Sequence, residues 1–89
     1  MTDRVSARIV LTGDVAHAAF PGWIARHAQK LGLTDVTARL IPNGLEIRAH
    51  GVAEMVQALA LGASLGPETV LVETVEVTTE GNVHPSERP

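Results

Sequence analysis

Two stretches of the chain alternate between apolar and polar positions. In residues 4–12 the apolar positions fall on one face, and they are Val5, Ala7, Ile9 and Leu11. A period of two with one apolar face predicts a half-buried β-strand. Residues 70–78 alternate in the same way, but the alternation slips between Val72 and Val75. This slip predicts a β-bulge in the last strand.

Two segments between these strands follow the period of an α-helix instead. The first has one continuous apolar stripe, made of Phe20, Trp23, Ile24, His27, Ala28 and Leu31. Pro21 falls in its first turn, where a missing N–H is tolerated, and Gly32 is suited to end it. The second helix opens at Gly51 and ends at Gly66-Pro67, with an apolar face of Val52, Met55, Val56, Leu59 and Ala63.

Residues 36–41 and 45–50 form a pair of strand patterns around Pro42-Asn43-Gly44. Asn-Gly supplies the positive φ angles that a tight hairpin needs. In the second strand of this hairpin the predicted inward residues are Leu45, Ile47 and Ala49, and the predicted outward residues are Glu46, Arg48 and His50.

The predicted order of elements is therefore β-α-β-β-α-β. It favours an α+β, ferredoxin-like sandwich, in which a four-stranded antiparallel sheet carries two helices on one face. We expect one domain over residues 1–79 and a flexible polar tail over residues 80–89. This fold hosts many unrelated activities, so it does not by itself define a function.

Composition and charge narrow the function classes. The 89 residues suffice for one domain, and the absence of cysteine excludes disulfides and thiolate metal sites. The formal net charge is −3 and the basic residues are scattered, which argues against nucleic-acid binding. No apolar run approaches the roughly 20 residues of a membrane helix or resembles a signal peptide. We expect a soluble cytoplasmic protein without a cofactor.

The segment between the first strand and the first helix resembles the signature region of acylphosphatases. Their pattern is Gly-x-Val-Gln-Gly-Val-x-Phe-Arg, followed by a helix that ends in Leu-Gly-Leu. The corresponding residues here are Gly13, Asp14, Val15, Ala16, His17, Ala18, Ala19 and Phe20, and the helix closes on Leu31-Gly32-Leu33. The hairpin with Glu46, Gly66-Pro67 and residues 72–77 are similar as well, so the resemblance spans about residues 5 to 78.

This resemblance implies a fold of the acylphosphatase-like type and hydrolysis of carboxyl-phosphate bonds without a metal. In the family, the amides of this loop and an arginine hold the phosphate, and an asparagine positions the attacking water. It therefore implies that residues 13–20 form an anion-binding loop for a small phosphate-containing or carboxylate anion.

The chain departs from the family at both catalytic positions. Pro21 stands where the arginine is expected, and Arg39 or Leu40 stands where the asparagine is expected. Because a proline has neither a cation nor an N–H, we expect the usual activity to be lost or severely weakened. We assign no catalytic residue and keep Arg39 as the candidate replacement cation.

The histidines do not form a metal motif. We interpret His17 as an exposed loop residue, with a replacement anion ligand or proton carrier as the alternative. His27 is expected to lie hydrogen-bonded at the edge of the core. His50 and His84 are far apart in the sequence, and we expect no metal site.

Arg8, Arg39 and Arg48 are all outward positions of strands and are predicted to share the face of the sheet opposite the helices with Glu46. We expect a solvated face of mixed charge. The alternatives are an ion pair of Glu46 with one arginine, and an anion site.

The second helix carries Ala58, Leu61 and Leu65 off its apolar face, either as isolated surface residues or as an association surface. Three hypotheses follow. The first is an acylphosphatase-like domain without efficient activity that binds a small anion or a protein. The second is an acylphosphatase that uses Arg39. The third is a homo-oligomeric regulatory or scaffold module that associates through Leu61 and Leu65 of the second helix, or through a sheet edge.

Overall fold

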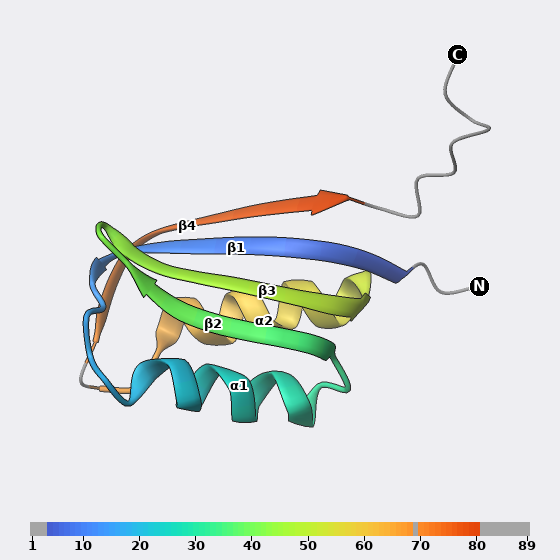
Figure 1. The fold of residues 1–89 in the computed structure, drawn as a ribbon, viewed down its shortest axis with the longest axis horizontal. Helices are drawn as coiled ribbons and strands as arrows, with labels where there is room; N and C mark the ends of the chain where they lie inside the picture. Colours follow the sequence, from blue (N-terminus) through green and yellow to red (C-terminus); the bar gives the residue numbers. More distant parts are fainter. Residues whose placement is uncertain (1–3, 69, 81–89) are drawn as a thin grey trace, which may run out of the picture.

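The predicted elements occur in the predicted order in a computed structural model, which describes residues 4–68 and 70–80 (Figure 1). They are β1 (Arg4–Asp14), α1 (Phe20–Lys30), β2 (Thr34–Ile41), β3 (Gly44–Val52), α2 (Ala53–Leu65) and β4 (Leu71–Glu80). Gly32 and Gly66 follow the two helices with φ angles of +77° and +57°, as expected for residues that end helices.

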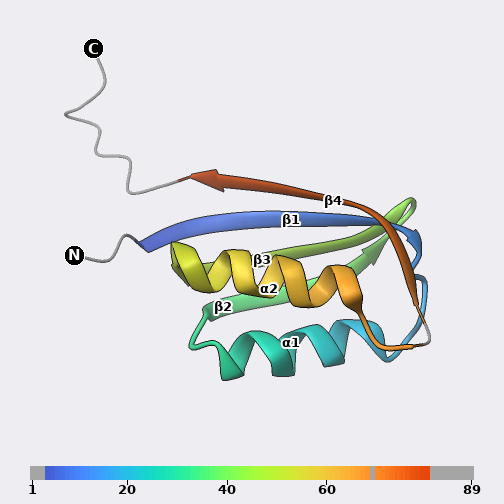
Figure 2. The ribbon, with the colours of Figure 1, turned by 180° about the vertical axis from the view of Figure 1, so that it is seen from behind.

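The strands form one sheet in the order β2-β3-β1-β4, and every neighbouring pair is antiparallel. Both helices lie against the same face of this sheet (Figures 1 and 2). We call the opposite face, which no described helix covers, the open face. The predicted ferredoxin-like α+β fold is confirmed. Neither described helix has the length and the apolar character needed to cross a bilayer.

The core lies between the sheet and the helices. Every predicted inward residue of β1 and β3 is buried in it: Val5, Ala7, Ile9, Leu11, Leu45, Ile47 and Ala49. The helices contribute Phe20, Ile24, Ala28, Val56, Leu59, Ala60 and Ala63. Alternation along the strands and the stripes along the helices therefore meet in one apolar layer, which leaves the polar face of each strand on the open face.

β1 extends two residues beyond its predicted end, to Asp14. Its register with β4 shifts after Thr12, which lies opposite Thr74, because Gly13 lies opposite Val72 and Glu73 is left as the extra residue. This is the predicted bulge. Gly13 has a φ angle of +128°, and a Cβ there would lie 2.7 Å from the backbone nitrogen of Glu73. The close approach of the two strands therefore requires glycine.

Other boundaries differ from the prediction as well, and two of them assign a residue to a different element. Gly51 does not open α2 but belongs to β3, where it pairs with Val5 of β1, and the helix begins at Ala53. Glu80 belongs to β4, where it pairs with Ser6, so the folded domain includes residue 80. The rest of the predicted tail, residues 81–89, lies outside the described residues.

Candidate functional site

The predicted anion-binding loop joins β1 to α1. Several of its backbone N–H groups donate hydrogen bonds to acceptors within the loop itself. The His17 N–H donates to the Val15 carbonyl at 2.8 Å, and the Phe20 N–H donates to the His17 carbonyl at 2.9 Å. The Ala19 N–H donates to Nδ1 of His17 at 3.2 Å. A phosphate cradle needs N–H groups that converge on open space. The N–H groups of these three residues are instead engaged in hydrogen bonds within the loop.

His17 is exposed, as predicted. Because its Nδ1 accepts the Ala19 hydrogen bond, the neutral ring carries its proton on Nε2. The ring thus serves as a cap for an amide at the start of α1, where the N-cap residue Ala19 has no side chain able to do so.

Pro21 lies in the first turn of α1, as the sequence predicts. This is the end of the helix where the backbone amides and the helix dipole favour an anion. At the position next to Phe20, however, the chain offers a pyrrolidine ring, which supplies neither a charge nor a hydrogen-bond donor.

A hollow of about 430 Å³ lies beside this loop, and we call it the loop hollow. It is lined by Thr12, Gly13, Val15 and Ala16, by residues 41–44 of the β2–β3 turn, and by Glu73. Among these lining residues the one charged side chain is the carboxylate of Glu73. An anion in this hollow would therefore meet a negative charge and no cation from the residues that line it.

Neither residue at the expected asparagine position lines the loop hollow. Arg39 lies on the open face, where its Nε donates to Oε1 of Glu46 at 3.0 Å and its side chain is 72% exposed. Leu40 is exposed on the edge strand β2. The candidate replacement cation thus has a carboxylate partner outside the hollow.

Six residues of the hollow were not singled out by the sequence analysis as site residues, and two of them, Asn43 and Glu73, carry an amide and a carboxylate. Asn43 had been assigned to the hairpin turn alone, but β1 and β2 run in the same direction, so the turn after β2 and the loop after β1 meet at one end of the sheet. The predicted topology contained this signal. Glu73 enters the hollow through the bulge, whose position the alternation of β4 had indicated.

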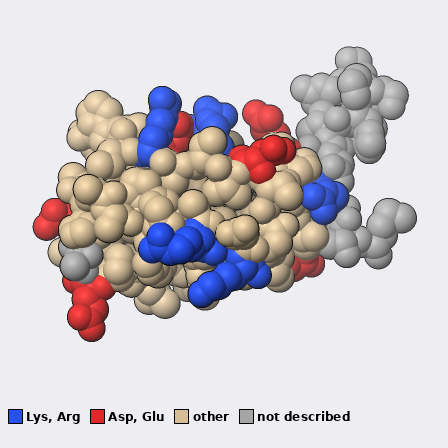
Figure 3. Space-filling model, turned by 60° about the horizontal axis from the view of Figure 1, so that its bottom comes forward, with Lys and Arg blue, Asp and Glu red and all other residues tan. Residues whose placement is uncertain are grey.

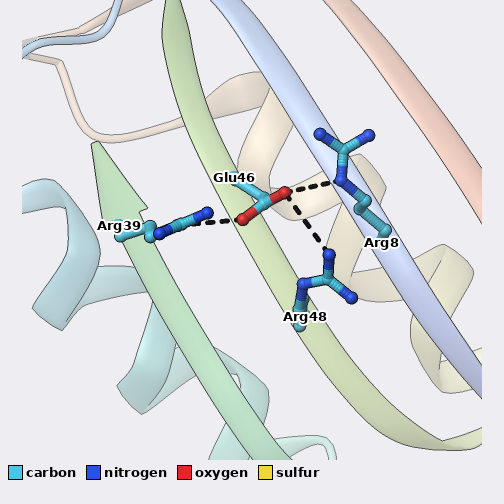
Figure 4. Close-up of polar contacts among 4 residues, drawn as sticks. All are labelled: Arg8, Arg39, Glu46 and Arg48. Carbon is cyan, nitrogen blue, oxygen red and sulfur yellow. Dashed lines mark hydrogen bonds and ion pairs between the residues drawn. The ribbon is translucent and has the colours of Figure 1, made fainter. Parts of the chain in front are cut away.

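Three arginines of the open face surround one glutamate (Figure 4). Nε of Arg8 donates to Oε2 of Glu46 at 2.5 Å, and Nη2 of Arg48 lies 3.8 Å from the same oxygen. With Arg39 on Oε1, the carboxylate has partners from β1, β2 and β3. We refer to these four residues as the arginine cluster.

Glu46 is only 5% exposed, so the expectation of a solvated mixed-charge face was wrong for this residue, and the ion-pair alternative was correct. The side chain is an outward position of β3, as predicted, but the arginine side chains of neighbouring strands cover it. The hydrogen bond from Arg8 lowers the pKa of the Glu46 carboxyl below its usual value, and that from Arg39 adds to this effect, while burial opposes it.

Of the remaining histidines, His27 and His50 contact neighbouring side chains of the fold. His27 is half-buried at the edge of the core, as predicted, and its ring stacks on Trp23 with centroids 5.4 Å apart. Nδ1 of His50 lies 3.1 Å from the Ser6 hydroxyl on the open face. His84 lies outside the described residues. Within residues 4–68 and 70–80, no group of three or more potential metal-ligating side chains occurs.

The outer surface of α2 carries the leucines singled out above. Leu61 is 65% exposed and Leu65 is 76% exposed. Beside them, Leu61 and Gln57 of α2 line a hollow of about 310 Å³ together with Val75 and Val77 of β4. Leu61, but not Leu65, thus borders a groove between the helix and the edge strand.

Basic side chains do not form one continuous patch on the side of the molecule seen in Figure 3, where Lys and Arg lie in separate groups. This distribution accords with the scattered basic residues of the sequence.

The same β-α-β-β-α-β fold occurs in solved acylphosphatases. A solved acylphosphatase from Coxiella burnetii matches 88% of this chain and 82% of its own with a TM-score of 0.79, at 20% identity. A curated protein of Alkalilimnicola ehrlichii named Acylphosphatase is 32% identical over 80 residues, 90% of each chain. Another of that name, from Caldivirga maquilingensis, is 37% identical over 79 residues, 86% of this chain and 82% of its own. No protein-family model matches the sequence. The chain belongs to the acylphosphatase family.

Proposed function

We propose that this member of the acylphosphatase family lacks efficient acylphosphatase activity and acts by binding, with a small anion or a protein as its partner. The observation that carries the proposal is Pro21 in the first turn of α1, at the position where the family has its phosphate-holding arginine.

The cost of this substitution follows from the chemistry of phosphoryl groups. An arginine holds phosphate through parallel charge-assisted hydrogen bonds, each worth about 1.5–3 kcal/mol. Loss of one such bond in the transition state lowers the rate about 10- to 150-fold, since each 1.4 kcal/mol corresponds to a factor of about 10. A bidentate guanidinium makes two of them.

Two further features support the same conclusion. The amides of His17, Ala19 and Phe20 donate to acceptors within the loop, so an incoming phosphate would have to break these bonds. Glu73 lines the loop hollow, and its carboxylate disfavours a second negative charge there. The loop therefore serves at best as a weak anion site.

Hydrolysis of acyl phosphates is the second candidate function, and the names of the curated relatives favour it. It requires a replacement cation, for which Arg39 is the candidate. Arg39 precedes Ile41, a residue that lines the loop hollow, by two positions of β2, or about 6.6 Å. A swing of its long side chain spans this distance, but only after Arg39 leaves Glu46.

Self-association through α2 is the third candidate, and the exposed Leu61 and Leu65 favour it. Size-exclusion chromatography with light scattering tests it. A mass that rises with concentration for the unmodified chain, and not for Leu61→Ser, would support association, whereas a strict monomer at high concentration would remove this candidate.

Turnover of benzoyl phosphate separates the first two functions. We expect the purified chain to hydrolyse it no faster than background. Pro21→Arg combined with Leu40→Asn, or with Arg39→Asn in the alternative register, should raise kcat/KM at least about tenfold. Pro21→Ala is the matched control, because it removes the proline without adding a cation, and circular dichroism shows whether each variant folds.

Rapid hydrolysis of benzoyl phosphate would also distinguish the two functions. Rapid turnover by the unmodified chain that Arg39→Ala abolishes would establish the hydrolase with a relocated cation and overturn our proposal. Failure of both restored variants, if they are folded, would show that the missing arginine and asparagine do not by themselves account for the inactivity.

A further inference from the structure

We propose a second anion site on the open face of the sheet, between Arg8 and Arg48, which takes the phosphoryl dianion of a small molecule. The site lies on the face opposite the helices, and its residues differ from those of the loop hollow. The proposal therefore holds whether or not the loop hydrolyses acyl phosphates.

Glu46 holds the two guanidinium groups in place but does not engage all of their N–H donors. Arg8 contacts the carboxylate through Nε, and its two Nη groups point away from Glu46 (Figure 4). Arg48 offers one Nη at the looser distance of 3.8 Å. Because an arginine has five N–H donors, each of these side chains keeps donors for a ligand. Arg48 is 62% exposed, so solvent reaches them.

A hollow of about 150 Å³ is lined by both arginines, and we call it the arginine hollow. Its lining includes Ser6 of β1 and Thr78 of β4 in addition to Arg8 and Arg48. The two hydroxyls are further potential donors. Ser6 also contacts Nδ1 of His50, and when the ring nitrogen donates to the Ser6 oxygen, the Ser6 hydroxyl hydrogen is directed elsewhere.

The charge of the open face favours an anion more than the chain as a whole does. Where the strands pair regularly, this face carries arginines at positions 4, 8, 39 and 48 and the acidic residues Glu46, Glu76 and Glu80. This part of the face is therefore slightly positive, although the chain carries a formal net charge of −3. Glu80 lines the arginine hollow and is the one acidic group there that opposes an anion.

The arrangement of donors fits a phosphoryl group better than a carboxylate. A carboxylate has two oxygens in one plane, and Glu46 already occupies the cluster in that way. A phosphoryl dianion has three terminal oxygens, which can accept from both guanidinium groups and from a hydroxyl at once. We expect a dissociation constant on the order of 1 mM for inorganic phosphate, since the site is open and its ion pairs are screened.

The test is a titration of the full chain with inorganic phosphate at pH 8, followed by NMR through the backbone amides and the arginine Nε–H groups. Sodium chloride at matched ionic strength is the reference. We expect saturable shifts at Arg8 and Arg48 with phosphate only. Arg8→Gln and Arg48→Gln should each weaken binding at least about fivefold, whereas Arg26→Gln on α1 should leave it unchanged.

Two additional variants place the site. Glu80→Gln should tighten phosphate binding, because it removes the opposing charge, and Pro21→Ala should leave the shifts on the open face unchanged. Shifts that chloride reproduces, or saturable binding that persists in both Arg8→Gln and Arg48→Gln, would overturn the proposal. Shifts confined to residues 13–20 would assign phosphate to the loop instead.

Discussion

The bulge that joins β1 to β4 can be tested by adding a single methyl group. A Cβ at Gly13 would overlap the Leu71 carbonyl oxygen and lie 2.7 Å from the backbone nitrogen of Glu73. Both groups belong to the backbone of the paired strand, so they cannot move aside as a flexible side chain does. The φ angle of +128° adds strain, because side chains other than glycine rarely adopt it.

The expected cost of Gly13→Ala is about 2–6 kcal/mol, from about 1–3 kcal/mol of backbone strain and a comparable cost of overpacking. A chain of this length has a free energy of unfolding of roughly 4–13 kcal/mol, so the loss is a large share of it. With an m-value of about 1–1.5 kcal/mol/M, the urea midpoint should fall by at least about 1.3 M.

Gly22→Ala is the matched control within the same region. Gly22 is exposed in the first turns of α1, and a Cβ there would lie 3.5 Å from Nη1 of Arg26, a flexible side chain. Alanine is the better helix former, so this variant should be up to about 1 kcal/mol more stable than the wild type. A Gly13→Ala variant within about 0.5 kcal/mol of the wild type would refute the close approach of the strands and thereby the described wall of the loop hollow.

Three other predictions concern Glu46, Gly62 and Ile47. Glu46→Gln should destabilise the chain at pH 7. The pKa of Glu46 is lowered from 4.5, so the difference in unfolding free energy between wild type and variant should be constant above about pH 5 and should shrink as the pH falls below 4.5. Urea titrations at several pH values measure this difference. A difference that does not change across that range would contradict the prediction. Gly62→Ala would place a methyl group against Nε2 of His27, which should disturb the stacking of the His27 ring on Trp23. The fluorescence of Trp23 should therefore change. A spectrum identical to that of the wild type would contradict this prediction. Ile47→Ala, fully buried in β3, should cost about 2–5 kcal/mol in urea unfolding, and a cost below 1 kcal/mol would contradict its place in the core.

The fold could be predicted because its signals are local. The alternation of β1 and β3 placed Ile9 and Ile47 on the buried face, and the stripe of α1 placed Phe20 and Ile24 there. Even the bulge was visible as a slipped period in β4. The extension of β1 to Asp14 was missed because Gly13 carries no side chain and therefore no polarity pattern.

The candidate site could be predicted only in part, because it depends on contacts between strands. The near-complete burial of Glu46 is caused by Arg8 and Arg39, which lie 38 and 7 positions away in the sequence. An alternating pattern gives the face on which a residue lies, but not whether its neighbours cover it. For the same reason, the carboxylate of Glu73 beside the loop became evident only in three dimensions.

The arginine cluster also bears on how the sheet avoids misassembly. Arg39 faces Glu46 only if β2 and β3 pair as observed, since a shift by one residue would turn the guanidinium toward the apolar layer under the helices. Such a shift would bury the charge of Arg39 among aliphatic side chains and leave Glu46 with one partner fewer. The same four residues that gather positive charge on the surface thus discriminate against slipped strands as the chain folds.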